Sequence, residues 1–126
     1  MKVAVLGAGR IGALHAGLLA ANPDVDTVLV ADELAERARE VAGSVDGGEA
    51  APIGDAIAAA DATVITAATS AHVELIEASL DASLPTFCEK PIALGLEETA
   101  AMVERVEREQ DAVSYTHLTL PTILLV

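Results

Sequence analysis

Three glycines near the start of the chain have the spacing of a phosphate-binding loop. The sequence Gly-Ala-Gly-Arg-Ile-Gly spans residues 7–12 and directly follows the apolar run 2–6. In this pattern the first glycine permits a tight turn, the second lets the backbone approach a pyrophosphate, and the third lets a helix pack closely on the strand. That helix would offer free N–H groups and its positive dipole end to phosphates, whereas the alternative is a purely structural turn. The residues expected to bind a dinucleotide are Gly7, Gly9, Arg10, Ile11 and Gly12.

A carboxylate follows the last glycine of this loop by 20 residues, at Asp32, after the apolar run Thr27–Ala31. A carboxylate in this place accepts hydrogen bonds from the adenosine ribose hydroxyls and repels a 2′-phosphate. Glu33 follows it where an arginine would favour the phosphate, so we expect NAD as the cofactor and NADP as the less favoured one. Asp32 also stands where it could cap a helix that begins near Leu34, and one side chain can do both.

Lys90 follows the short apolar segment Thr86–Cys88. The end of such a strand lies at the carboxyl edge of a parallel sheet, where ligands bind. A lysine there can donate to a substrate oxygen or assist a proton transfer. The alternative is that Lys90 forms a surface ion pair with Glu89, which would contribute little to stability. The residues alone leave these two interpretations open.

Two other reactive side chains are predicted to be structural. His15 stands one turn past the glycine loop, on the inward face of the predicted helix, where packing is the expected role. Cys88 is the single cysteine, which excludes an internal disulfide and a cysteine-clustered zinc site. We expect it to be a small buried hydrophobe, and we expect no metal.

The elements that must position these residues alternate between short apolar runs and helical patterns. Strands are predicted over residues 2–6, 27–31, 62–67 and 86–88, with at most a short one within 44–52. Apolar residues at helical spacing predict helices between them, the first carrying Ile11, Leu14, Leu18 and Leu19, and a last helix over 97–110. Repeated βα units of this length predict a Rossmann-type α/β fold, a doubly wound parallel sheet with helices on both faces.

Composition narrows the class of protein further. A chain of 126 residues is about one domain, and its net charge of −13 argues against a nucleic-acid surface. The acidic excess indicates a solubilising surface, with a salt-adapted source as the alternative. No apolar stretch is long enough to span a membrane and no signal peptide is apparent, so we expect a cytoplasmic protein.

The character of the sequence changes at Val113. Residues 113–126 contain no Asp, Glu, Lys or Arg, whereas the preceding residues are rich in charge. A buried last strand is one interpretation. We favour another, because Val113–Thr122 resembles the translation of a transposase-type sequencing adapter. On this interpretation residues 1–112 are an NAD-binding domain and residues 113–126 are a non-native tail.

Several of these segments together resemble one family. The segments are Gly7–His15, Asp32, Thr66–His72 and Phe87–Pro91, and the family comprises glucose–fructose oxidoreductase, inositol 2-dehydrogenase and rhizopine-catabolism proteins. The resemblance covers residues 1–110 and is closest to the inositol 2-dehydrogenase branch. It implies an oxidoreductase that transfers hydride between a nicotinamide and a secondary alcohol of a sugar or polyol.

The resemblance also implies roles for individual residues. Lys90 would be the catalytic-site lysine, with a cis peptide bond to Pro91 that would aim it, and Glu89 would lie against the nicotinamide ribose. Ala68, Thr69 and His72 would line the cofactor cleft. The family's remaining catalytic Asp and His lie on a C-terminal α/β domain, which forms the sugar pocket and the oligomer interface.

That second domain is expected to be missing from this chain. We therefore expect a homo-oligomeric parent enzyme, and a fragment that is inactive alone and self-associates through uncovered apolar surface. A non-catalytic dinucleotide-binding sensor or regulator on the same fold is the alternative function. Other Rossmann reductases, such as dihydrodipicolinate reductase or homoserine dehydrogenase, lack Glu-Lys-Pro at this position and fit less well.

Two segments depart from the family pattern. Ala68-Thr69-Ser70 stands where a proline is usual, which leaves the backbone path of that loop open. Ser83-Leu84-Pro85 replaces the customary Ala-Gly-Lys before the segment 86–88. Proline can open a strand without removing a ladder hydrogen bond, so we expect the fold to tolerate the second change.

Overall fold

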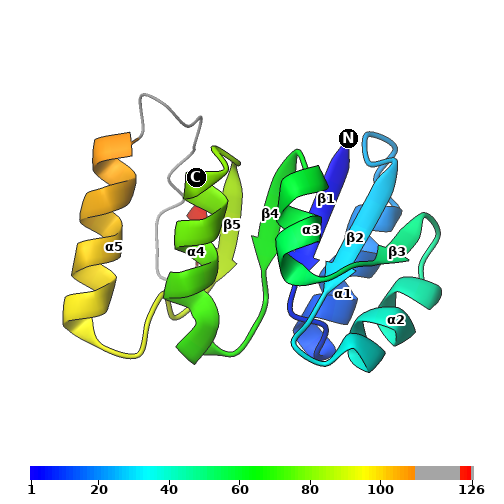
Figure 1. Ribbon diagram of the computed structural model, residues 1–126, viewed down its shortest axis with the longest axis horizontal. Coiled ribbons are helices and arrows are strands. Elements are labelled where there is room, and N and C mark those ends of the chain that lie inside the picture. The colour runs from blue at the N-terminus through cyan, green and yellow to red at the C-terminus, as the bar shows by residue number, and fades with distance from the viewer. Residues whose placement is uncertain (110–122, 126) are drawn as a thin grey trace.

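The computed structural model describes residues 1–109 and 123–125 (Figure 1). The strands are β1 (Lys2–Leu6), β2 (Thr27–Ala31), β3 (Gly48–Ala50), β4 (Ala62–Ile65), β5 (Thr86–Glu89) and β6 (Ile123–Leu125). The helices are α1 (Arg10–Ala20), α2 (Ala35–Gly43), α3 (Ile53–Ala59), the 3₁₀ helix η1 (Thr69–Ala71), α4 (His72–Asp81) and α5 (Leu96–Glu109).

The strands form one sheet in the order β3-β2-β1-β4-β5-β6. The pairs among the first five strands are all parallel, which confirms the predicted Rossmann-type α/β fold. Strand order reverses between β1 and β4, and ligands of such sheets bind at this point, outside the carboxyl ends of the strands. Those ends point down in Figure 1, where the loops into α1, α2, α4 and α5 gather.

The segment of altered composition falls largely outside the described residues. Its described part, β6, pairs antiparallel with β5, so that Cys88 lies opposite Leu124. The interpretation of residues 113–126 as a non-native tail stays a prediction.

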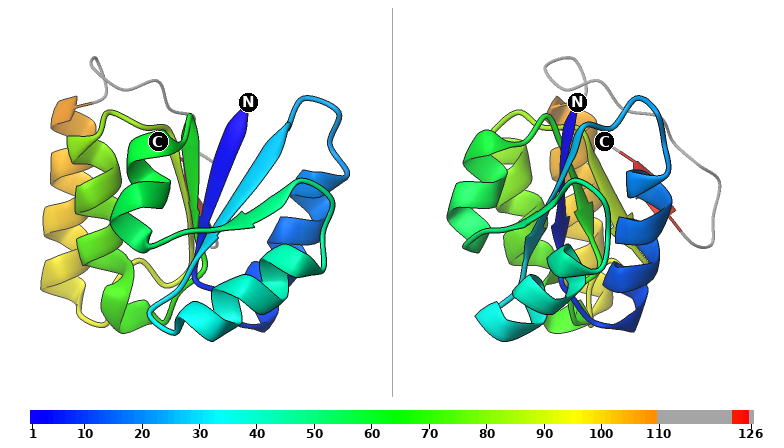
Figure 2. Two further views of the ribbon diagram at one scale, coloured as in Figure 1. Left: turned by 45° about the vertical axis from the view of Figure 1, so that its right-hand side comes forward. Right: turned by 90° about the vertical axis from the view of Figure 1, so that its right-hand side faces the viewer.

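Alternation along the strands divides the core into two layers. Val3 and Val5 of β1 pack on the side of α1 and α2, whereas Ala4 and Leu6 pack on the side of α3, α4 and α5. Successive strand residues point to opposite faces, so a strand covered on both sides must be apolar throughout. Figure 2 shows α1 on the opposite side of the sheet from α3 and α4.

Helix α1 packs on the sheet through its small residues. Gly12 and Ala16 are its buried residues, while Ile11, Leu14 and Leu18 are 46%, 58% and 62% exposed. The apolar repeat recognised in the sequence therefore lies mostly at the surface, because only small side chains let α1 approach the sheet closely. This face fits the expectation of uncovered apolar surface, and self-association stays a prediction.

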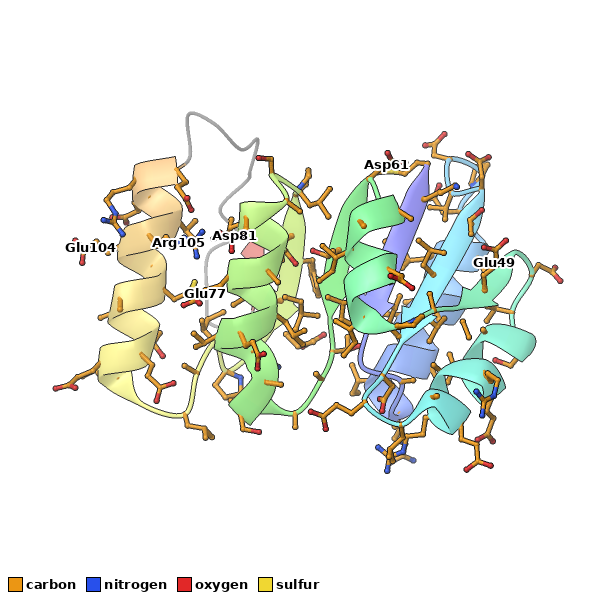
Figure 3. The ribbon with its side chains drawn as sticks, in the orientation of Figure 1. Glu49, Asp61, Glu77, Asp81, Glu104 and Arg105 are labelled. Atoms are coloured by element: carbon orange, nitrogen blue, oxygen red, sulfur yellow. The ribbon has the colours of Figure 1, made fainter. Side chains whose placement is uncertain are left out.

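Helix α5 lies beside α4 at one end of the layer. It buries Met102 and Val106, which are one turn apart. Figure 3 shows Arg105 and Asp81 pointing toward one another from the two helices, and their Nη2 and Oδ1 atoms are 2.6 Å apart. In the described part of the chain, each helix is too short or too polar to cross a bilayer.

The turn from α4 into β5 accommodates the unusual Ser83-Leu84-Pro85. Ser83 has a positive φ of 57°, and the N–H groups of Ser83 and Leu84 donate to the carbonyls of Leu80 and Ser79. This is the hydrogen-bond pattern of a Schellman C-cap, in which glycine is the usual residue at the position of Ser83. The carbonyl of Pro85 accepts from the N–H of Thr63, so the strand opens as expected.

Candidate dinucleotide-binding site

The glycine loop connects β1 to α1. At two of its three glycines, neighbouring backbone leaves no room for a side chain. Gly7 has a φ of +116°, and a Cβ atom built on it would lie 2.4 Å from the backbone nitrogen of Ala67. A Cβ atom on Gly12 would lie 1.8 Å from the carbonyl oxygen of Gly7. A Cβ atom on Gly9, by contrast, would meet nothing within 4 Å. Two glycines are therefore required by the fold, and the backbone at Gly9 is open to an incoming group.

The first turn of α1 begins at Gly9, and its backbone N–H groups are the hydrogen-bond donors nearest to the open side of the loop. Gly9 is the N-cap residue, and it provides no side-chain cap hydrogen bond. The first intrahelical bond of this turn runs from the Ala13 N–H to the Gly9 carbonyl, so the N–H groups of Arg10 and Ile11 precede the ladder. Arg10 and Ile11 are exposed, as a contact with a ligand requires. This arrangement fits the pyrophosphate of a dinucleotide.

Asp32 follows β2, and its carboxylate forms a hydrogen bond with the backbone of the glycine loop. Its Oδ2 atom accepts from the Ala8 N–H at 2.7 Å, and its Oδ1 atom accepts from the Leu34 N–H at 2.8 Å. The second bond closes a turn ahead of α2, whose N-cap is Leu34 without a side-chain cap hydrogen bond, so Asp32 does not itself cap the helix. Each carboxylate oxygen retains a lone pair for a ribose hydroxyl.

A pocket of about 380 Å³ opens between the glycine loop, α2 and the β4–α4 connection. Gly7, Asp32 and Ala68 line it together, as the sequence predicts. Arg37 and Ile53 also line it, and the sequence analysis missed both. The topology holds the signal that would have found Ile53, because the residues after β3 must reach the same carboxyl edge as those after β1 and β2.

The loop after β4 keeps the path that the family's proline would impose. Ala68 has a φ of −59°, which lies within the range to which proline is fixed. Ala68 is exposed and Thr69 is half-buried, at the start of η1. The Thr66 hydroxyl donates to the Gly7 carbonyl at 2.8 Å and ties this loop to the glycine loop.

His72 lies behind the wall of the cleft rather than on it. Its side chain is 1% exposed, with Nδ1 2.7 Å from the Pro91 carbonyl oxygen and Nε2 2.9 Å from that of Ala67. Both partners only accept hydrogen bonds, so the imidazolium satisfies both and a neutral ring satisfies one. His72 was expected to line the cofactor cleft. The structure instead buries its ring, which joins the end of β4 to the segment after β5.

His72→Leu is expected to lower the free energy of unfolding by about 2–3 kcal/mol, because it removes the ring that lies between two partly buried carbonyls and leaves at least one of them without its donor. His72→Gln keeps one donor and should lose less. Urea denaturation followed by circular dichroism measures both variants. Equal stabilities for wild type and His72→Leu would contradict this reading of the contacts.

The carboxyl end of β5 carries the remaining predicted residues. Glu89 ends the strand, and its Oε1 atom lies 2.9 Å from Nε2 of His15. Lys90 follows with an exposed side chain, and its peptide bond to Pro91 is cis. The His15 ring also packs against Phe87, so His15 combines the expected packing with a polar contact to Glu89. Glu89 and Lys90 lie outside the pocket around Asp32, at the carboxyl end of β5, the strand next to β4.

Cys88 is fully buried between these residues and the core, as predicted. Burial, with a smaller contribution from the Glu89 carboxylate, raises the pKa of the Cys88 thiol from 9.0 to about 12. The thiolate is the reactive form, so Cys88 is not a nucleophile at neutral pH.

Alkylation of Cys88 by iodoacetamide at pH 8 is expected to be about a thousandfold slower in the folded chain than in urea, from the pKa difference alone. Mass spectrometry of timed samples measures the two rates. Comparable rates in the two states would show that the thiol is accessible and ionised.

Residues 1–117 match the family of glucose–fructose oxidoreductase, inositol dehydrogenase and rhizopine-catabolism proteins. This family is described as an oxidoreductase family with an NAD-binding Rossmann fold. The chain belongs to this family. The resemblance recognised in the glycine loop and in Phe87–Pro91 is thereby confirmed. The chain is thus an NAD-binding oxidoreductase domain.

Relatives named as inositol dehydrogenases are similar to this domain. A myo-inositol dehydrogenase of Streptomyces leeuwenhoekii is 41% identical over 86% of this chain and 34% of its own length. An inositol 2-dehydrogenase of Rhizobium meliloti is 42% identical over 84% of this chain and 32% of its own. A crystal structure of a putative myo-inositol dehydrogenase from Sinorhizobium meliloti superposes with a TM-score of 0.78 at 41% identity, covering 87% of this chain and 34% of that one. The chain thus spans about a third of the length of these relatives.

Proposed function

We propose that this domain binds NAD, in preference to NADP, for a dehydrogenase that oxidises a secondary alcohol of an inositol-like polyol. The observation that carries the proposal is the glycine loop, which is closed at Gly7 and Gly12, open at Gly9 and bonded to the Asp32 carboxylate. Such a loop accepts a pyrophosphate at its open side and a ribose at the carboxylate.

Different residues at the carboxyl edge of the sheet would hold different parts of the cofactor. The backbone from Gly9 to Ile11 would hold the pyrophosphate, Asp32 the adenosine ribose, and Ala68 and Thr69 the wall of the cleft. Glu89 would accept a hydrogen bond from the nicotinamide ribose. The nicotinamide, when bound, supplies the hydride acceptor or donor.

Lys90 would act on the substrate itself. Its ammonium group would donate a hydrogen bond to the reacting hydroxyl oxygen and stabilise that oxygen as its proton leaves. The reacting alcohol would be oxidised to a ketone, with its hydride accepted by a bound nicotinamide and its proton by a base outside the described residues. The inositol-like substrate rests on the two relatives at 41% and 42% identity. A cytoplasmic, homo-oligomeric parent enzyme completes the proposal.

Calorimetric titration of the chain with NAD⁺ and with NADP⁺ tests cofactor binding. We expect saturable binding of NAD⁺ and weaker binding of NADP⁺. A folded chain that binds neither would overturn the proposal. Assay of a gene product that includes the substrate domain, with myo-inositol and with glucose, tests the substrate class. Binding without turnover of any polyol would favour the sensor alternative.

Asp32→Ser is expected to weaken NAD⁺ binding about tenfold and to narrow or reverse the preference over NADP⁺, because a like charge no longer faces the 2′-phosphate. Asp32→Asn is the matched control, since it retains an acceptor oxygen without the charge. The ratio of the two dissociation constants measures the effect. A ratio unchanged in Asp32→Ser would show that Asp32 serves the loop alone.

A further inference from the structure

We infer that His15 is a positioning residue, which holds the Glu89 carboxylate in the orientation that receives the nicotinamide ribose. The inference rests on the proposed function, which assigns Glu89 to that ribose. It starts from a contact between residues 74 positions apart, in which Nε2 of His15 lies 2.9 Å from Oε1 of Glu89.

The contact is partly shielded from solvent and occupies only one of the two carboxylate oxygens. The side chains of His15 and Glu89 are 22% and 32% exposed. An ionised carboxylate only accepts hydrogen bonds, so Nε2 of His15 must carry a proton. Among the described residues, the Oε2 atom of Glu89 has no hydrogen-bond partner. This second oxygen is the one that remains for a ligand hydroxyl.

The imidazole is itself held in place from two sides. Its backbone belongs to α1, and its ring lies against Phe87 of β5, with centroids 5.4 Å apart and planes inclined by 55°. A glutamate at the end of a strand has three rotatable side-chain bonds, and ordering it costs conformational entropy. The contact with a packed ring selects its orientation before a ligand arrives.

The same helix thereby fixes two parts of the site. The first turn of α1 carries the N–H groups of Arg10 and Ile11, proposed for the pyrophosphate, and its next turn carries His15. The distance from the phosphate site to the Glu89 carboxylate is then set by a rigid element, as pre-organised sites require.

His15→Phe retains the aromatic contact with Phe87 and removes the donor, whereas His15→Gln keeps an N–H near the position of Nε2. We expect His15→Phe to weaken NADH binding about five- to tenfold, and His15→Gln to stay within about twofold of wild type. Binding of ADP, which has adenosine and pyrophosphate but no nicotinamide ribose, should be unchanged in both. Leu18→Gln, on the exposed face of the same helix, is the control for altering α1.

Fluorescence titration of NADH and calorimetric titration of ADP separate the outcomes. His15→Phe overturns the inference if it leaves NADH affinity within twofold of wild type, or if it weakens ADP equally, which would show a general effect on the loop. A wild-type chain that binds neither ligand overturns the proposed function itself, and the inference with it. Adding Glu89→Gln to His15→Phe should cost little more than the larger of the two single effects, because the two residues act through one contact.

Nuclear magnetic resonance of the free chain tests the contact without any ligand. The ring nitrogens of ¹⁵N-labelled His15 should report a proton on Nε2 in wild type, and this preference should weaken in Glu89→Gln. A neutral His15 ring with its proton on Nδ1 would show that the hydrogen bond to Glu89 is not made.

Discussion

Replacing Gly9 with alanine is expected to weaken NAD binding about a hundredfold and to leave the fold intact. Gly9 has φ −80° and ψ −160°, a conformation open to any residue, and its added Cβ atom would meet nothing within 4 Å. The methyl group would instead occupy the side from which a pyrophosphate must approach the backbone. We expect affinity to fall by about two orders of magnitude, since several charge-assisted hydrogen bonds weaken together. Calorimetric titration with NAD⁺ measures the loss, and circular dichroism verifies the fold.

Two other glycines provide the contrast for this experiment. Gly12→Ala places a Cβ atom 1.8 Å from the Gly7 carbonyl, so it should fail as a folded protein rather than as a binding site. Gly17→Ala introduces the same methyl group into open space on α1 and should stabilise the helix by about 0.5–1 kcal/mol. NAD binding by Gly9→Ala at wild-type affinity would show that the open side of the loop is not the phosphate site.

The second large effect is expected at Lys90. In a gene product that includes the substrate domain, Lys90→Met should lower kcat by about 10²- to 10⁴-fold while the dissociation constant for NAD⁺ stays unchanged. The reason is position, because Lys90 is exposed at the carboxyl end of β5 and lies outside the pocket that Gly7 and Asp32 line. Rapid kinetics of NADH formation with the polyol substrate measures kcat.

The other lysine of the chain is the matched control. Lys2 is also exposed, but it begins β1 and therefore lies at the opposite edge of the sheet. Lys2→Met should leave both kcat and NAD⁺ affinity unchanged. An unchanged kcat in Lys90→Met would show that Lys90 is a surface residue without a catalytic role. A loss of NAD⁺ affinity together with kcat would show that Lys90 contacts the cofactor instead.

The sequence alone determined the architecture, and it named three residues that the fold brings together at one pocket. The strands expected at residues 2–6 and 27–31 agree with β1 and β2, and Gly7, Asp32 and Ala68 meet around one pocket as expected. The strand predictions succeeded, and the three pocket residues lie together, because the signals for them are local. Apolar runs, glycine spacing and the distance to the next carboxylate are properties of one βα unit and its neighbour.

Only the tertiary structure decided which partners the two histidines contact. His72 was expected in the cleft and instead bonds two backbone carbonyls behind it, and His15 was expected to pack and also reaches Glu89. Leu14 and Leu18 of α1 face solvent because the buried residues of this helix are the small Gly12 and Ala16. Each outcome depends on how closely a helix approaches the sheet and on partners many residues away, and the spacing of residues along one element contains neither quantity.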